Sequence, residues 1–201
     1  MPNLRVAARL GAPMGTPRRA VSVHRIRPGP PRVATRLAFM DLAAAHPDVL
    51  VLVGTQTGNS ETVADAVAER LADLGFDAHV VDMAEAYPEM LTDYRQAVVV
   101  MCTWADGTFP DNGKDFEDAL PVIAPDLADL AFGIVGLGDR EYHPYYQTAA
   151  RWLRDRLGEY GGTEAVPLHE IDGTPTPDDI AGALAWTDRI ATAFAALPAS
   201  G

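Results

Sequence analysis

A run of apolar residues that leads straight into a small polar loop constrains the fold of this chain more than any other feature. The run covers residues 49–53, the loop Gly54–Glu61 follows, and apolar residues then recur at helical spacing as far as Leu71. A buried strand therefore leads into a loop and the loop into a helix. Small hydroxyl and amide side chains, two glycines and a helix N-terminus are typical of a site for one phosphate group. The lysine of a P-loop is absent, because Asn59-Ser60 follows the second glycine. A polar turn that binds nothing is the alternative explanation of this loop.

The same alternation of strand and helix continues along the chain. We expect strands near 49–54, 78–82, 97–102, 131–136 and 165–171, and helices near 60–74, 84–92, 113–121, 146–160 and 177–196. Consecutive pairs of this kind predict an α/β fold, with a doubly wound five-stranded parallel sheet and helices on both of its faces. The length of 201 residues suffices for one such domain.

Charge divides the chain near Met40. Residues 1–39 carry eight arginines and no acid, whereas residues 40–201 hold all 28 acidic residues against eight basic ones. The first segment is rich in proline and has no apolar periodicity, so we expect a disordered extension or a misassigned start of translation, dispensable for ligand binding. A targeting segment or a partner-binding arm is the alternative. The acidic part, 40–201, should repel nucleic acid and anionic membranes, and it suits a basic partner surface.

Cysteine and histidine usage narrows the possible sites. The single cysteine, Cys102, excludes an internal disulfide and fits the reducing cytoplasm. The five histidines are scattered without the spacing of metal ligands, so we expect no metal site. No apolar run reaches the length of a membrane span. We expect a monomer.

Two further loops place an aromatic residue just after a predicted strand. The loop 102–112 contains Trp104, and the loop 136–146 contains Tyr142 beside glycines that allow close backbone approach. The carboxyl ends of parallel strands share one edge of a sheet, so these loops should meet the first one there. A single aromatic residue in a loop usually only packs. Together the three loops predict a site for a planar ring with a phosphate at one end.

These loops resemble those of the flavodoxin family. The family patterns are roughly [ST]-x-T-G-[NT]-[ST], S-T-[YW]-G-[DE]-G and G-x-G-[DN]-x-x-Y, and the resemblance covers residues 49 to about 195. The chain resembles a short-chain flavodoxin or the FMN module of a diflavin reductase. The resemblance implies the strand order 2-1-3-4-5, FMN as the cofactor and no catalytic residue.

The resemblance also implies a role for each matching residue. The phosphate is surrounded by Thr55, Gln56, Thr57, Asn59 and Ser60, and Gly58 permits the tight turn. The ring stacks between Trp104 and Tyr142, with Asp139 near its pyrimidine edge. Main chain near the ring comes from Thr103, Leu137, Gly138 and Tyr146. The remaining cofactor-binding positions are Cys102, Ala105, Asp106 and Gly107.

Two of these residues depart from the family pattern. Cys102 stands where Ser or Ala is usual, so one hydroxyl near the phosphate is missing, and we interpret the thiol as a small filler that resists ionisation. Ala105 stands where Gly is usual. In the family, the peptide there turns over on one-electron reduction and needs a positive φ, which is unfavourable for a residue with a Cβ. The first one-electron potential should therefore be lowered, unless Gly107 takes up the strain or the loop holds the turned-over form beforehand.

The resemblance implies an FMN-binding carrier of low reduction potential. It would pass single electrons from a separate NAD(P)H-dependent reductase to a redox acceptor protein with a basic surface. One alternative is an FMN-dependent NAD(P)H:quinone reductase on the same fold. Another is an interaction module that has lost its flavin, against which Trp104 and Tyr142 argue.

Overall fold

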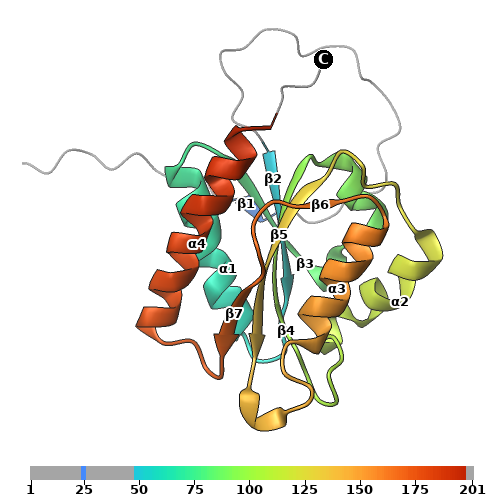
Figure 1. Cartoon of the computed structure of the whole chain (residues 1–201), viewed down its shortest axis with the longest axis vertical. Helices are drawn as coiled ribbons and strands as arrows, with labels where there is room; N and C mark the ends of the chain where they lie inside the picture. Colours follow the sequence, from blue (N-terminus) through green and yellow to red (C-terminus); the bar gives the residue numbers. More distant parts are fainter. Residues whose placement is uncertain (1–23, 26–47, 198–201) are drawn as a thin grey trace, which may run out of the picture.

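The computed structural model describes residues 24–25 and 48–197, and these residues form one parallel sheet covered by helices on both faces (Figure 1). The strands are β1 His24–Arg25, β2 Asp48–Gly54, β3 Asp77–Asp82, β4 Gln96–Cys102, β5 Ala131–Gly138, β6 Thr163–Glu164 and β7 His169–Asp172. Their order across the sheet is β1-β3-β2-β4-β5, and both β6 and β7 pair with β5. With β2 as the first predicted strand, this order confirms the predicted 2-1-3-4-5 arrangement and the α/β class.

Alternate residues of the central strands supply two separate cores. On β2, Val49, Val51 and Val53 face one side of the sheet, and Leu50 and Leu52 face the other. All five side chains are buried, as expected for a parallel strand covered on both faces.

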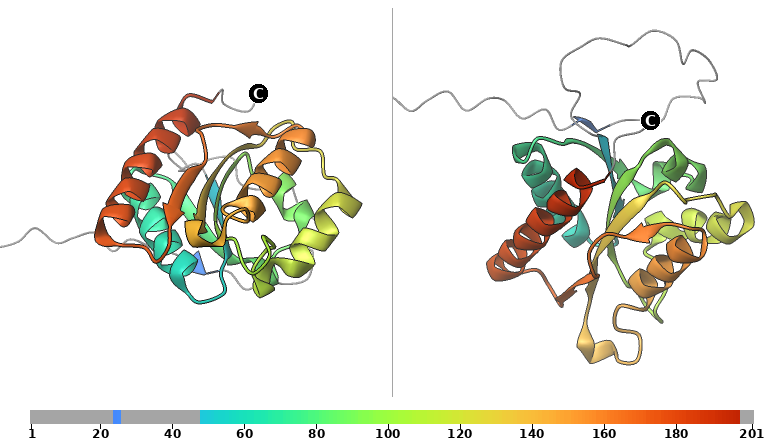
Figure 2. Two further views of the ribbon diagram at one scale, coloured as in Figure 1. Left: turned by 60° about the horizontal axis from the view of Figure 1, so that its bottom comes forward. Right: turned by 45° about the horizontal axis from the view of Figure 1, so that its top comes forward.

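Two helices cover each face. The helices are α1 Asn59–Asp73, α2 Lys114–Ile123, α3 Thr148–Glu159 and α4 Pro177–Ala195. Helices α1 and α4 pack together over one face, and α2 and α3 cover the other, as Figures 1 and 2 show. Helix α4 begins with a capping box, in which Thr176 and Asp179 satisfy each other's backbone N–H groups.

Two predicted elements differ in detail from the structure. The short helix predicted at 84–92 consists of two 3₁₀ segments, η1 Met83–Glu85 and η2 Pro88–Asp93, because Pro88 has no N–H to continue a helix from the residues before it. The fifth strand, predicted at 165–171, is split into β6 and β7. The remaining short 3₁₀ segments are η3 Asp111–Gly113 and η4 Arg140–Tyr142.

The predicted extension lies largely outside the described residues. Within it, His24 and Arg25 form β1, which adds a parallel strand to the outer edge of β3. At these two residues the expectation of disorder is wrong. The predicted boundary near Met40, and the rest of the segment 1–39, fall on residues that the structure does not describe.

Candidate cofactor site

A cavity of about 420 Å³ opens at the carboxyl edge of the sheet, between the loops that follow β2, β4, β5 and β7. It is lined by Thr55, Gln56, Thr57, Asn59, Ser60, Cys102, Thr103, Trp104, Ala105, Leu137, Gly138, Asp139, Tyr142, Tyr145, Tyr146, Gly173 and Thr174. The predicted residues that do not line it are Gly58, Asp106 and Gly107. Sequence reasoning did not select Tyr145, Gly173 or Thr174, although the turn at Gly173 was a recognisable signal.

The loop between β2 and α1 presents hydrogen-bond donors to this cavity. Gly58 has a φ of 88° and turns the chain into α1, and its N–H donates to Thr55 Oγ1 at 3.0 Å. No side chain caps the N-terminus of α1, so the first N–H groups of the helix remain available to a ligand. The Ser60 side chain is fully buried at this point, and its hydroxyl has no hydrogen-bond partner. An anion at this position would satisfy these groups.

A second segment, which sequence reasoning did not select, braces the same loop. Asn112 Oδ1 accepts a hydrogen bond from the Thr55 N–H at 2.8 Å, while its Nδ2 donates to the Val53 carbonyl at 3.1 Å and to Asp82 Oδ1 at 2.9 Å. The neighbouring Asp111 exchanges two hydrogen bonds with the Gln56 side chain. The amide of Gln56 is therefore engaged in holding the loop.

Cys102 lies where this loop meets the end of β4. Its side chain is partly buried and lines the cavity. Burial raises the pKa of the Cys102 thiol, against a smaller opposite effect from a hydrogen bond with the Gln56 backbone. The thiol is therefore neutral at physiological pH, as the sequence analysis expected.

The loop after β4 holds Trp104 at the cavity mouth on a closed turn. Trp104 and Thr108 exchange two backbone hydrogen bonds of 2.9 Å, and Gly107 N donates to the Trp104 carbonyl at 3.0 Å. The Thr148 hydroxyl, at the start of α3, lies 2.9 Å from the Gly107 carbonyl oxygen and so ties the turn to α3. Within the turn Ala105 has a φ of 43° and Gly107 a φ of 91°. The indole is 42% exposed, which is unusual for so large an apolar group.

The loop after β5 brings a second aromatic surface to the cavity. Tyr142 is 65% exposed. Asp139 Oδ1 accepts the Glu141 N–H at 2.8 Å, and so it caps the 3₁₀ turn that presents Tyr142. On the far side of the loop, Asp172 Oδ1 accepts the Arg140 N–H at 2.9 Å. The loop is thus attached to the end of β7.

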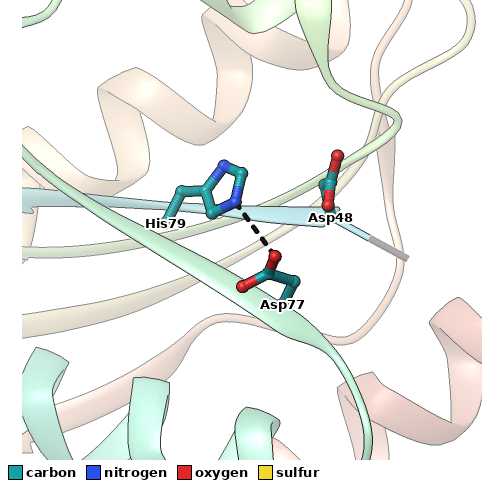
Figure 3. Close-up of side chains that lie close together, drawn as sticks. All are labelled: Asp48, Asp77 and His79. Carbon is teal, nitrogen blue, oxygen red and sulfur yellow. Dashed lines mark ion pairs between the residues drawn. The ribbon is translucent and has the colours of Figure 1, made fainter. Parts of the chain in front are cut away.

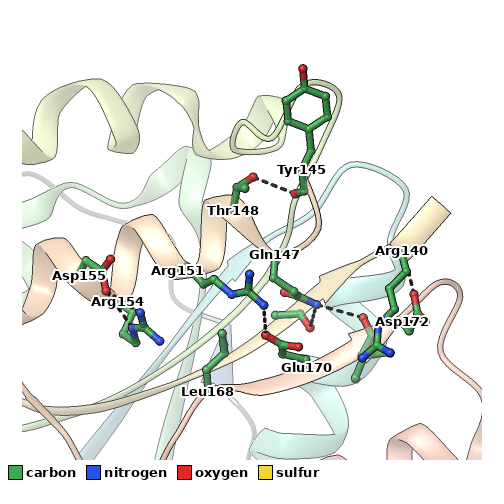
Figure 4. Close-up of polar contacts among 12 residues, drawn as sticks. Arg140, Tyr145, Gln147, Thr148, Arg151, Arg154, Asp155, Leu168, Glu170 and Asp172 are labelled. Atoms are coloured by element: carbon green, nitrogen blue, oxygen red, sulfur yellow. Dashed lines mark hydrogen bonds and ion pairs between the residues drawn. The ribbon is translucent and has the colours of Figure 1, made fainter. Parts of the chain in front are cut away.

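Gln147 fixes the base of this loop from below. It is fully buried and has a φ of 60°, and its Nε2 donates to the carbonyls of Gly136 at 2.9 Å and Ile171 at 3.2 Å (Figure 4). A Cβ at Gly136 would lie 2.1 Å from Gln147 Oε1, so this contact requires glycine on β5. The glutamine joins β5 to β7 beneath the cavity.

The donor set and the shape of the cavity together fit a phosphate-bearing planar cofactor. Neutral hydroxyl and backbone donors line the cavity, and Ser60 Oγ and Thr103 Oγ1 are buried and unpartnered. Two exposed aromatic side chains, Trp104 and Tyr142, line it as well. Such surfaces stack favourably on a conjugated ring.

No helix among the described residues is long and apolar enough to cross a membrane.

Comparisons with known proteins agree with this geometry. The flavodoxin family model matches residues 51–186. The chain is 34% identical over 130 residues to the sulfite reductase [NADPH] flavoprotein alpha-component of Bacillus subtilis, covering 64% of the chain and 21% of that protein. It is 32% identical over 136 residues to NADPH-dependent diflavin oxidoreductase 1 of Yarrowia lipolytica, covering 66% of the chain and 20% of that protein. The chain therefore spans about a fifth of the length of these curated relatives.

Solved structures of similar fold match over nearly their whole length. A flavodoxin from Pseudomonas aeruginosa, solved as a cysteine-to-serine mutant, is 27% identical with a TM-score of 0.66, and the match covers 73% of this chain and 97% of that one. A short-chain flavodoxin associated with a non-canonical PDU bacterial microcompartment is 26% identical with a TM-score of 0.65, over 73% and 97% of the two chains. The chain belongs to the flavodoxin family, and its cofactor is FMN.

Proposed function

We propose that this protein carries single electrons between a separate NAD(P)H-dependent reductase and a redox acceptor protein with a basic surface. The observation that carries the proposal is the pairing of exposed Trp104 and Tyr142 with the neutral donor loop in one open cavity. Such a cavity binds a ring while leaving it within reach of a partner protein. FMN, when bound, supplies the electron-transfer chemistry.

Each loop has a distinct task in this proposal. The N–H groups at the start of α1, with Thr57 and Ser60, hold the phosphate by hydrogen bonds without a cation. Trp104 and Tyr142 hold the ring and exclude water from its faces. Asp139, at the edge of the cavity, disfavours added negative charge nearby and so favours a low reduction potential.

The charge of the chain supports a partner with a basic surface. Residues 40–201 hold 28 acidic and eight basic residues, and Asp106, Asp111 and Asp139 lie on the loops around the cavity. Opposite charge on a partner would speed encounter with this edge of the molecule. Two of the relatives named above are a sulfite reductase [NADPH] flavoprotein and an NADPH-dependent diflavin oxidoreductase. Their names support the proposal that the electrons come from NADPH.

The test is to follow electrons through the reconstituted protein. The FMN-loaded protein is photoreduced in the absence of oxygen, with EDTA as the sacrificial electron donor, and mixed with cytochrome c, a basic one-electron acceptor. We expect rapid oxidation by cytochrome c, and no steady NADPH oxidation with a quinone unless a reductase is added. Sustained NADPH:quinone turnover by the purified protein alone would instead support the quinone reductase alternative. Failure to take up FMN would support the interaction-module alternative.

A further inference from the structure

Three potential metal ligands lie at the opposite end of the sheet from the cofactor cavity. Asp48 begins β2, Asp77 begins β3, and His79 follows two residues later on β3 (Figure 3). The strand register pairs Asp48 with Asp77, and residues two apart on a strand share a face. One ligand atom from each side chain lies within 4.8 Å of the other two.

Within the part of the chain that the structure describes, no lysine or arginine pairs with either carboxylate. Like charges on paired positions of neighbouring strands repel each other. Asp77 Oδ2 lies 3.5 Å from His79 Nε2. The Asp77 side chain is 50% exposed, so an ion from solvent can reach it. A cation at this position would offset the repulsion.

The imidazole of His79 is oriented by a neighbour. The Nδ1 atom lies 2.9 Å from the Tyr94 hydroxyl, and the two rings pack edge to face with centroids 5.7 Å apart. This contact leaves Nε2 directed at the carboxylate of Asp77. Histidine ligands of metals usually have their second nitrogen held in this way.

We propose that Asp48, Asp77 and His79 bind one divalent transition-metal ion of the zinc type. One imidazole nitrogen and two carboxylate oxygens are ligands that Zn²⁺ accepts at about 2.0–2.2 Å, which places ligand atoms about 3.3 Å apart around a tetrahedral ion. Nε2 of His79 and Oδ2 of Asp77 are already near that separation, and a rotation of the exposed Asp48 carboxylate completes the set, with water as the fourth ligand. When zinc takes the Nε2 lone pair, the ring proton sits on Nδ1 and is donated to the Tyr94 oxygen.

This ion would join the first residues of β2 and β3 and leave the cofactor cavity untouched. The sequence did not reveal the site, because the three ligands are brought together by strand pairing over 29 residues and not by a local motif. A ligand that binds only the folded state raises the free energy of unfolding. The site therefore acts as a clamp on the amino end of the sheet.

Zinc titration of the untagged full chain tests the proposal. After treatment with a chelator, calorimetry in a phosphate-free buffer should show one saturable site, and zinc should raise the melting temperature. We expect His79→Gln and Asp77→Asn each to weaken zinc binding at least tenfold. Tyr94→Phe should weaken it about tenfold, because the ring loses its orienting partner. Cobalt should give visible d–d absorption in the wild type that is lost in His79→Gln.

Two exposed residues provide matched controls, His143→Gln for the histidine and Glu89→Gln for the acids. Both variants should bind zinc with the affinity of the wild type. Wild-type zinc affinity in His79→Gln would show that the ion binds elsewhere, and it would overturn the proposal. An absence of saturable binding to the wild type would overturn it as well. If His79→Gln does not fold, Asp48→Asn, at an exposed position, decides the question by the same measurement.

Discussion

Ala105 occupies a conformation that its side chain disfavours. Its φ of 43° lies in the left-handed region, where a Cβ costs roughly 1–2 kcal/mol relative to glycine. The turn from Trp104 to Thr108 holds it there through three backbone hydrogen bonds. The positive φ that the family's peptide turn requires is therefore already present. The backbone strain at Ala105 thus exists before the flavin is reduced.

Ala105→Gly should release this strain in every redox state. The gain is opposed by the greater freedom of glycine in the unfolded chain, about 0.4–1 kcal/mol. We expect a stabilisation between zero and about 1.6 kcal/mol in urea unfolding of the apoprotein. Because about 1 kcal/mol corresponds to about 40 mV for one electron, potentiometry should show the first couple moving by less than this amount. A rise of 40 mV or more would indicate that Ala105 becomes strained only on reduction.

Ser60 and Thr57 provide a second prediction about single residues. The double variant Thr57→Ala/Ser60→Ala should weaken FMN at least tenfold and riboflavin little, because hydrogen bonds to a charged group contribute about 1.5–3 kcal/mol each. Titration of the apoprotein with both flavins measures the difference. Thr62→Ala is the control, since its hydroxyl donates to the Gly58 carbonyl and does not line the cavity. Equal losses of affinity for FMN and riboflavin would show that this loop does not bind the phosphate.

Among the elements, the segment Asp111–Gly113 links the ends of two strands to the phosphate loop. Asn112 contacts the backbone of Val53 and Thr55 at the end of β2 and the side chain of Asp82 at the end of β3. The loop therefore keeps its shape through hydrogen bonds from a segment more than fifty residues away. This bracing prepares the donors for a ligand and reduces the ordering that binding requires.

Asn112→Ala should weaken FMN binding about tenfold and lower the free energy of unfolding by about 1–3 kcal/mol, because the Thr55 N–H and the Val53 carbonyl lose their partner. Calorimetric titration with FMN and urea unfolding measure the two effects. Asn112→Asp is a useful comparison, because it keeps the acceptor for Thr55 but places a carboxylate against Asp82. We expect it to be the weaker binder of the two at neutral pH. Wild-type affinity in both variants would show that the brace is dispensable.

The elements that the sequence predicted well are those with local signals. Apolar periodicity located β2, β4, β5 and the four α-helices to within a few residues, and three strand-end loops located most of the cavity lining. Contacts over long separations had no such signal. Asn112 reaches its partners only after β2 and β4 pair, and Gln147 reaches Ile171 only after β7 joins β5. The predicted fifth strand is likewise split by long-range pairing, because β6 pairs with the first residues of β5 and β7 pairs with its last residues.

At the scale of the whole molecule, the parallel sheet separates two kinds of chemistry. Its carboxyl edge carries the cofactor cavity, and its amino edge carries the cluster of Asp48, Asp77 and His79. The charge is unevenly divided as well, since residues 40–201 hold all the acidic groups of the chain. An oppositely charged partner would be drawn to this acidic part.

Electron transfer to a basic acceptor should slow steeply as salt rises. Exposed charges are screened over about 8–10 Å at roughly 0.10–0.15 M ionic strength, so the steering of encounter weakens. Stopped-flow oxidation of the reduced protein by cytochrome c, measured from low to high salt, should show a fall of at least tenfold. An uncharged quinone serves as the control and should react at a nearly constant rate. A rate with cytochrome c that does not depend on salt would indicate apolar docking.

The position of Cys102 allows the fraction of protein molecules that hold FMN to be measured by alkylation. It is the only cysteine in the chain, it lines the cavity, and burial raises its pKa. Alkylating reagents react with thiolates, so modification should be slow at neutral pH and accelerate only at a pH more alkaline than an ordinary cysteine requires. Bound FMN should shield the sulfur at every pH. The mass added by a brief alkaline pulse of iodoacetamide would then count the empty molecules in any preparation, including one inside a crude extract.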